Sequence, residues 1–233
     1  MTDGVRVGQL WRYPVKSLLG ERSSSLRVVE DGVDGDRVWG IQDCSDSRIL
    51  TARREPRLLF ASSRIDARSG LPLITLPDGQ LLTGPGPDTD SALSTWLSKP
   101  VTLVAAAECD ASRAEYFADA TDVTAAGLRE SAAAYSSGAW DMRRFRPNIF
   151  LELDGEGWLE DAWADRPIRI GSAELVPRRR CVRCTMVNRA QPSMGRDLNI
   201  YKTLHRMHRG EAGMWTQVVH SGVISEGDSV QIH

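Results

Sequence analysis

The sequence predicts a mainly β protein with a few helices. Two observations lead to this fold class: many short runs of β-forming residues separated by Gly, Pro and Asp, and only four stretches with a helical pattern. Short strands with such turns between them are typical of barrels and sandwiches. The chain has 233 residues, of which 41% are hydrophobic and 26% charged. It can therefore bury one sizeable core or two modest ones.

The strands are predicted where apolar and β-branched residues cluster over three to eight positions. These runs are residues 5–11, 38–42, 58–65, 71–76, 101–105, 148–153, 168–170, 173–176, 214–219 and 229–232. A turn is predicted at Pro77-Asp78-Gly79, because proline presets φ and glycine accepts a positive φ.

Helices are predicted where apolar residues recur at helical spacing or alanine dominates. The first covers 90–97 after the candidate caps Asp88 and Thr89, and the last covers 198–209 and ends at Gly210. Between them lie an Ala-rich helix at 124–135 and a short helix at 158–163.

Composition and charge exclude several classes of protein. No window approaches the roughly 18 consecutive apolar residues of a membrane span, and the N-terminus lacks the profile of a secretory signal. We therefore expect a cytoplasmic protein that does not bind membranes. The formal net charge of −2 also argues against a general nucleic-acid binder.

The charge is unevenly distributed along the chain. Residues 141–210 hold fourteen Arg and Lys residues against nine acidic ones. We expect an anion-attracting surface in this part of the chain, since guanidinium groups bind oxyanions through two parallel hydrogen bonds.

The sharpest local motif is a Cys-x-x-Cys pair, Cys181 and Cys184, within a cluster of arginines. Neighbouring guanidinium groups favour the thiolate, which is the form that attacks or binds metal. A buried structural pair is equally compatible with the motif. A zinc site with His205 and His208 has unfavourable spacing, so we favour packing roles for the two histidines. A thioredoxin-like pair would have to open a helix, whereas 176–187 is predicted as strand and loop.

Further motifs follow one another along the chain. In the N-terminal half they are Tyr13-Pro14-Val15-Lys16-Ser17, Gly35-Asp36-Arg37-Val38-Trp39 and residues 50–58. In the C-terminal half they are Arg144-Phe145-Arg146-Pro147-Asn148, Trp158, Trp163, Ile170-Gly171, Cys181-Val182-Arg183-Cys184 and Gly227-Asp228. Together they resemble the MOSC family, which includes the mitochondrial amidoxime reducing component and its bacterial relatives.

The resemblance spans nearly the whole chain and implies its organisation. We expect an N-terminal β-barrel module over residues 1–110 and a MOSC-type β-barrel domain, which binds the cofactor, over residues 111–233.

The resemblance also implies a molybdenum cofactor, in which the metal is held by a pterin (molybdopterin). Cys184 matches the cysteine that binds the metal, and a soft thiolate suits a metal already bound by dithiolene sulfurs. Cys181 would lie nearby without being a ligand. The residues expected around the pterin and its phosphate are Lys16, Ser17, Arg37, Arg146, Asn148 and Arg183. Asp119 matches an acid close to the metal and is our candidate for proton handling, whereas Arg178, Arg179 and Arg180 are predicted as ordinary surface residues.

The function implied is that of a molybdenum-dependent oxidoreductase that reduces small N-oxygenated molecules. The sequence contains no nucleotide-binding loop and no iron–sulfur cysteine cluster, so we expect electrons from a separate donor protein. Residues 185–190 depart from the Thr-Val-Asp-Pro stretch of the amidoxime reducers, which leaves the substrate open. The alternatives are a carrier of the cofactor or of a Cys184 persulfide, and a zinc-bearing interaction module.

Overall fold

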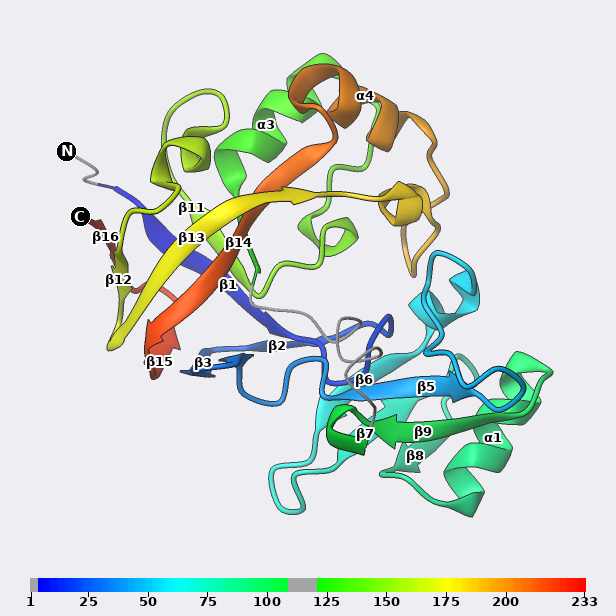
Figure 1. Ribbon diagram of the computed structural model, residues 1–233. Coiled ribbons are helices and arrows are strands. Elements are labelled where there is room, and N and C mark those ends of the chain that lie inside the picture. Colours follow the sequence, from blue (N-terminus) through cyan, green and yellow to red (C-terminus); the bar gives the residue numbers. More distant parts are fainter. Residues whose placement is uncertain (1–3, 109–120) are drawn as a thin grey trace. The chain divides into compact units, whose positions relative to one another are not determined.

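The computed structural model describes residues 4–108 and 121–233 (Figure 1). Within these ranges the protein is mostly β, with several sheets and three α-helices, so the predicted fold class is confirmed. The predicted boundary at residue 110 lies outside the described residues and stays a prediction.

The chain forms two compact units. Unit 1 comprises Met1–Trp11, Arg22–Asp34 and Asp119–His233, and unit 2 comprises Arg12–Glu21 and Gly35–Ala118. Unit 1 therefore combines the C-terminal half of the chain with two segments from near its beginning.

Unit 1 is built on an eight-stranded sheet with the order β16-β12-β13-β14-β10-β11-β1-β2. The strands in chain order are β1 (Arg6–Arg12), β2 (Glu21–Ser23), β10 (Thr121–Thr124), β11 (Ile149–Glu152), β12 (Ile168–Ile170), β13 (Ala173–Val182), β14 (Glu211–His220) and β16 (Val230–Ile232). In this sheet β10 and β11 run parallel, whereas β1 with β11, β10 with β14, β12 with β13, β12 with β16 and β13 with β14 pair antiparallel. A smaller sheet of β15 (Gly222–Ser225), β3 (Ser25–Val29) and β4 (Gly32–Val33) belongs to the same unit.

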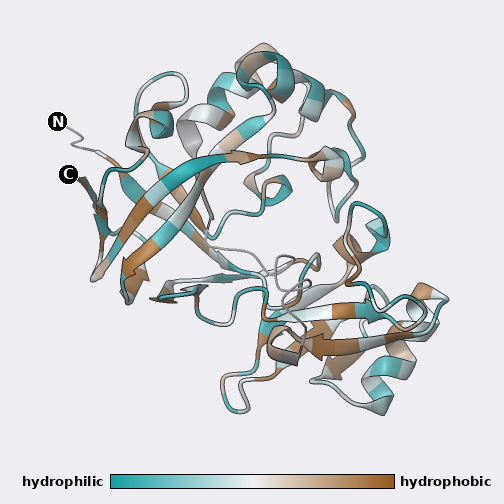
Figure 2. Cartoon of the chain, viewed as in Figure 1, coloured by the Kyte–Doolittle hydropathy of each residue, from teal (hydrophilic) through white to brown (hydrophobic). Residues whose placement is uncertain are grey.

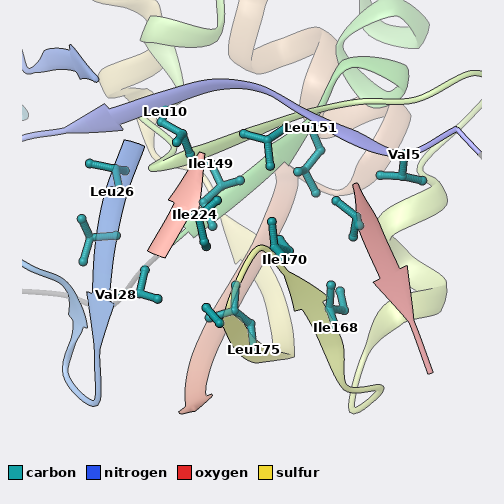
Figure 3. Packing of buried hydrophobic residues seen from close by; sticks show 14 of the residues in the cluster. Val5, Leu10, Leu26, Val28, Ile149, Leu151, Ile168, Ile170, Leu175 and Ile224 are labelled. Atoms are coloured by element: carbon teal, nitrogen blue, oxygen red, sulfur yellow. The ribbon is translucent and has the colours of Figure 1, made fainter. Parts of the chain in front are cut away.

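The main core of unit 1 lies among these strands. Figure 3 shows side chains from β1, β3, β11, β12, β13 and β15 converging on one another. The alternation of buried and exposed residues along β3 is that of a strand with one face on the core. Figure 2 shows the hydrophobic residues concentrated on strands, whereas many of the connecting loops are hydrophilic.

A second core of unit 1 is formed around two helices, α3 (Ala125–Ala134) and α4 (Asn199–His208), which contact each other (Figure 1). It also includes the surroundings of the short 3₁₀ segments η3 (Met142–Arg144) and η5 (Thr185–Asn188). Its buried members are Leu128, Met142, Phe145, Val187, Ile200, Leu204 and Ala212. A third 3₁₀ segment, η4 (Leu159–Trp163), precedes β12.

Unit 2 contains two small sheets and one α-helix. One sheet pairs β5 (Trp39–Asp43) with β9 (Val101–Ala105), and the other has the order β6-β7-β8, with β6 (Ser62–Ile65), β7 (Pro72–Thr75) and β8 (Leu81–Thr83). Helix α1 (Pro87–Leu97) contacts β9 and β8, and the 3₁₀ segment η2 (Ala106–Glu108) follows β9. The Pro77-Asp78-Gly79 turn joins β7 to β8 with Gly79 at φ +89°.

The element predictions differ from the structure in three places. The strand predicted at 58–65 is wrong over its first half, because Pro56 begins the 3₁₀ segment η1 (Pro56–Phe60) and β6 starts only at Ser62. Helix α1 begins at Pro87, before the predicted caps, and Gly86 is its N-cap. The short strands β2, β3, β4, β8, β10 and β15 were not predicted.

The helix predicted at 198–209 is confirmed as α4. It ends with Arg209 in the left-handed region at φ +55°, followed by Gly210 at φ +81°, whose N–H donates to the Leu204 carbonyl. No helix of the described residues is long and apolar enough to cross a membrane.

Neighbouring residues of β15 allow a direct test of the main core. Ile224 is 0% exposed, whereas Val223 is 48% exposed. We expect Ile224→Ala to lower the free energy of unfolding by about 2–5 kcal/mol, through lost burial and a residual cavity. Urea unfolding of the whole chain, followed by circular dichroism, measures the change.

Val223→Ala is the matched control, and we expect it to change the free energy of unfolding by at most about 0.5 kcal/mol. Equal destabilisation by the two substitutions would contradict the assignment of the core.

Candidate functional site

The Cys-x-x-Cys motif lies where strand β13 ends. Cys181 is a buried residue of the strand, and Cys184 is half-buried at the N-cap of η5; neither forms a disulfide. The register of β13 against β14 shifts at three places: between Glu174 and Leu175, between Pro177 and Arg179, and between Arg180 and Val182. Pro177 cannot donate to the ladder, which accounts for the second irregularity. The two thiols therefore have different environments, and only Cys184 is partly accessible.

Arg183, between the cysteines, has a buried guanidinium held by main-chain carbonyls. Its Nε and Nη2 donate to the Ala212 carbonyl at 2.8 and 2.6 Å, and its Nη1 donates to the Phe145 carbonyl at 2.6 Å. The guanidinium also lies 5.9 Å from the centroid of the Phe145 ring. These contacts join the end of β13 to the 144–148 motif, and a role of Arg183 toward a cofactor stays a prediction.

Arg144 makes the most extensive set of hydrogen bonds around the site. It is 1% exposed, and its guanidinium donates to the carbonyls of Ala139, Val187, Arg189 and Gly195 at 2.8–3.0 Å. Burial lowers the pKa of the guanidinium from its ordinary value, and the charges of Asp197 and Asp141 oppose this effect. In the sequence Arg144 belongs to a family motif but has no predicted role, because a sequence does not show that an arginine is buried.

The segment after Cys184 is a compact loop. The main chains of Gln191 and Met194 exchange two hydrogen bonds of 2.9 Å. Asn188 accepts a hydrogen bond from the Asp197 N–H at its carbonyl and one from the Tyr201 N–H at its side-chain oxygen. Residues 189–195, named here the Arg144 loop, are thus held by main-chain hydrogen bonds and by the Arg144 guanidinium.

Two more predicted site residues lie just after Arg144. Asn148 is fully buried, and its Nδ2 donates to the Trp11 carbonyl at 3.1 Å. The Asn148 carbonyl in turn accepts the Trp11 N–H at 2.8 Å, so the motif is fixed to β1. Arg146 is buried and has φ +53°.

Three predicted cofactor-binding residues share a rare backbone conformation. Ser17, Arg37 and Arg146 have φ values of +69°, +53° and +53° and are three of eight non-glycine residues with positive φ in the described chain. This conformation costs on the order of 1–3 kcal/mol per residue and is concentrated at functional sites. The sequence did not predict it, since serine and arginine give no signal for positive φ.

Lys16, Ser17 and Arg37 belong to unit 2 and lie close together there. The Lys16 N–H donates to the Trp39 carbonyl, and the Arg37 N–H donates to the Tyr13 carbonyl. The Arg37 guanidinium forms an ion pair with Asp36 and lies 5.0 Å from the centroid of the Tyr13 ring. The Ser17 hydroxyl accepts the Ala52 N–H at 3.1 Å.

Cys184, Arg183, Arg146 and Asn148 belong to unit 1. Asp119, the predicted proton-handling residue, lies outside the described residues.

The two histidines of the zinc alternative lie on α4, and His208 has other partners. Its Nε2 lies 2.9 Å from Asp161 Oδ2, its Nδ1 lies 3.0 Å from the Glu211 carbonyl, and its ring stacks on Trp158 at 4.2 Å between centroids. In residues 4–108 and 121–233, no group of three or more His, Cys, Asp or Glu side chains is arranged to hold a metal ion. The predicted packing role of His208 agrees with these contacts.

The three arginines before Cys181 are exposed or half-buried on β13 and interact with neighbouring side chains. Arg178 donates to Gln217 and Asp165, and Arg180 pairs with Asp161 and Glu211. The Arg179 guanidinium lies 5.4 Å from the centroid of the Trp215 ring.

A cavity of about 470 Å³ lies beside η3 in unit 1. Its wall includes the aromatic residues Trp11, Trp140 and Phe150, together with Asp141 and Arg143. Trp140 also stacks on Phe145, next to the buried Arg144. Burial opposes ionisation of Asp141, but its hydrogen bonds from the Arg143 side chain and N–H outweigh that effect and hold its pKa below the ordinary value.

We expect Arg144→Lys to destabilise the protein strongly, because one ammonium cannot reach four carbonyls. Hydrogen bonds to a charged group contribute roughly 1.5–3 kcal/mol each, so the free energy of unfolding should fall by at least about 3 kcal/mol. Arg143→Lys changes a partly exposed neighbour and should cost at most about 1 kcal/mol. Urea unfolding measures the free energy of unfolding of the two variants. A similar decrease in both would contradict the role of Arg144.

Comparisons of the fold with solved structures give distant matches. The chain is similar to the YUAD protein of Bacillus subtilis, with 13% identity, a TM-score of 0.53 and coverage of 98% of this chain and 95% of that one. YiiM of Escherichia coli matches with 11% identity and a TM-score of 0.45, over 99% of this chain and 68% of that one. At these identities the likeness to YUAD concerns the fold alone. No curated protein matches the sequence.

Comparison with protein families gives two matches that together cover almost the whole chain. The MOSC N-terminal beta barrel domain matches residues 4–124, and the MOSC domain matches residues 81–231. The MOSC match includes the Cys-x-x-Cys motif at the end of β13 and the motif around Arg144, and the chain belongs to the MOSC family.

Proposed function

We propose that this protein binds a molybdenum cofactor through Cys184 and reduces small N-oxygenated molecules with electrons from a separate protein. MOSC domains are associated with molybdenum-cofactor binding, which supports the first part. The observation that carries the proposal is the environment of Cys184. Its thiol is partly accessible and forms no disulfide. Cys184 follows a strand and precedes the Arg144 loop, whose Arg189 carbonyl accepts a hydrogen bond from Arg144.

The donor chemistry of this position fits the proposed group. Molybdenum in the cofactor already carries two dithiolene sulfurs, so the protein has to add only one soft ligand, and a thiolate is such a ligand. Cys181, buried on β13, is less accessible and is not needed as a ligand.

Backbone strain near the site also supports the proposal. Arg146 keeps its left-handed conformation within a segment that Arg144 on one side and Asn148 on the other hold firmly. A strained residue persists only where its surroundings determine its conformation, and a binding role is the common reason for such an arrangement. A guanidinium placed in this way suits the phosphate of the pterin.

The proposed reaction removes oxygen from the substrate. When bound, the cofactor would supply the two-electron oxygen-transfer chemistry. An amidoxime takes up two electrons and two protons, the N–O bond breaks, and an amidine and water are formed. The residues of this chain would bind and orient the reactants. Asp119 is the proposed source of a proton.

Substitution of Cys184 tests the anchor. We expect Cys184→Ser, purified from a molybdenum-replete host, to lose bound molybdenum while retaining its fold, because a hydroxyl is a poor substitute for a soft thiolate. Cys181→Ser is the matched control and should retain most of the metal. Metal analysis together with circular dichroism gives both readouts, and equal molybdenum in wild type and Cys184→Ser would exclude the assignment.

Turnover tests the reaction. We expect the cofactor-loaded protein to convert an amidoxime to its amidine with a chemical reductant, and to show no turnover with NADH alone. The second expectation follows from the sequence, which contains no motif for accepting a hydride and relaying single electrons. Product formation is measured by chromatography.

Two outcomes would change the proposal. A molybdenum-loaded preparation that is inert with every N-oxygenated substrate and a competent donor would favour a carrier of the cofactor or of a persulfide. NADH-driven turnover by the pure chain would show that it contains a redox site that we have not identified.

A further inference from the structure

Gln191 in the Arg144 loop has a buried side chain whose amide is unsatisfied. The residue is 3% exposed, and neither its Nε2 nor its Oε1 has a hydrogen-bond partner among the described residues. Burying a carboxamide without partners is unfavourable, so such groups in native proteins usually meet a bound water, ion or ligand. The two donors and the acceptor of the Gln191 amide are therefore without partners in the described part of the chain.

The main chain around Gln191 is held in place from both sides. Arg144 binds the carbonyls of Arg189 and Gly195, on either side of Gln191 along the loop, and the Gln191 main chain pairs with Met194. A side chain on such a loop is pre-organised, so little conformational entropy is lost when a ligand binds.

The loop follows Cys184 closely along the chain. Gln191 is seven residues after Cys184, and only the short segment η5 lies between the thiol and the loop. Asn148, the carboxamide that the family resemblance assigns to the cofactor, already donates from its Nδ2 to the Trp11 carbonyl. Gln191 is the carboxamide whose polar atoms are both without a partner in the described chain.

We propose that Gln191 binds the pyrimidine edge of the pterin. The amino and oxo groups of this edge present donors and acceptors side by side in one plane, and a carboxamide can form two parallel hydrogen bonds to such an edge. This inference rests on the proposed function, and it assigns to the cofactor a residue that the family motifs do not include.

The test compares cofactor affinity with the stability of the cofactor-free chain. Gln191→Met keeps the size of the side chain and removes its amide. We expect Gln191→Met to bind the cofactor about ten- to hundredfold more weakly than the wild type. Bound pterin is quantified by its fluorescence after release, at a temperature where both proteins are folded. The melting temperature of the cofactor-free protein should stay the same or rise, because an unsatisfied buried amide is removed.

Two further variants sharpen the test. Gln231→Met makes the same substitution at an exposed position of β16 and should change neither readout. Gln191→Glu keeps the shape but replaces the donors with an acceptor and adds a negative charge, so it should weaken binding at least as much as Gln191→Met.

The outcomes separate this inference from the proposed function. A wild-type protein from a cofactor-producing host that holds neither molybdenum nor pterin would overturn both. A wild-type protein that binds the cofactor, with equal affinity in Gln191→Met, would overturn only the role of Gln191. If Gln191→Met lowered the melting temperature and left affinity unchanged, the amide would have a structural partner such as a buried water, and the inference would be wrong.

Discussion

The buried guanidinium of Arg144 is the interaction on which the candidate site depends. It binds four main-chain carbonyls from segments that lie up to 56 residues apart in the chain, from Ala139 to Gly195. Each of these carbonyls would otherwise lose a hydrogen bond in a buried environment, which is costly. Arginine suits this role because its guanidinium has five donors in a fixed plane, whereas lysine has one compact ammonium. The loop after Cys184 is thus ordered by a residue that belongs to another motif.

A second buried arginine gives the end of β13 a similar support. Arg183 connects the carbonyls of Ala212 and Phe145, and it lies directly before Cys184. Both guanidinium groups donate to main-chain carbonyls, so their charge is stabilised by main-chain dipoles. Both arginines are buried, and the charges of Asp197 and Asp141 act on Arg144.

Stability and function make opposite demands on this region. The strained Arg146 and the unsatisfied amide of Gln191 each destabilise the folded chain. The second core around Phe145, Val187 and Leu204 offsets this cost by burying apolar surface beside the same segments. Residues that conflict with local preferences are expected where a protein binds a ligand, which is the common feature of these positions.

The sequence by itself determined the fold class, most of the strands, the helix at 199–208 and the family, because apolar periodicity, turn residues and ordered motifs are local signals. It missed six strands of two to five residues, among them β4, whose two residues give no periodicity. It also placed Arg144 in a motif and did not single out Gln191. Only the tertiary structure decided that Arg144 orders the loop after Cys184, that Arg146 is strained and that the Gln191 amide is unsatisfied. These properties depend on burial and on hydrogen bonds between segments far apart in the chain, which no local pattern of residues encodes.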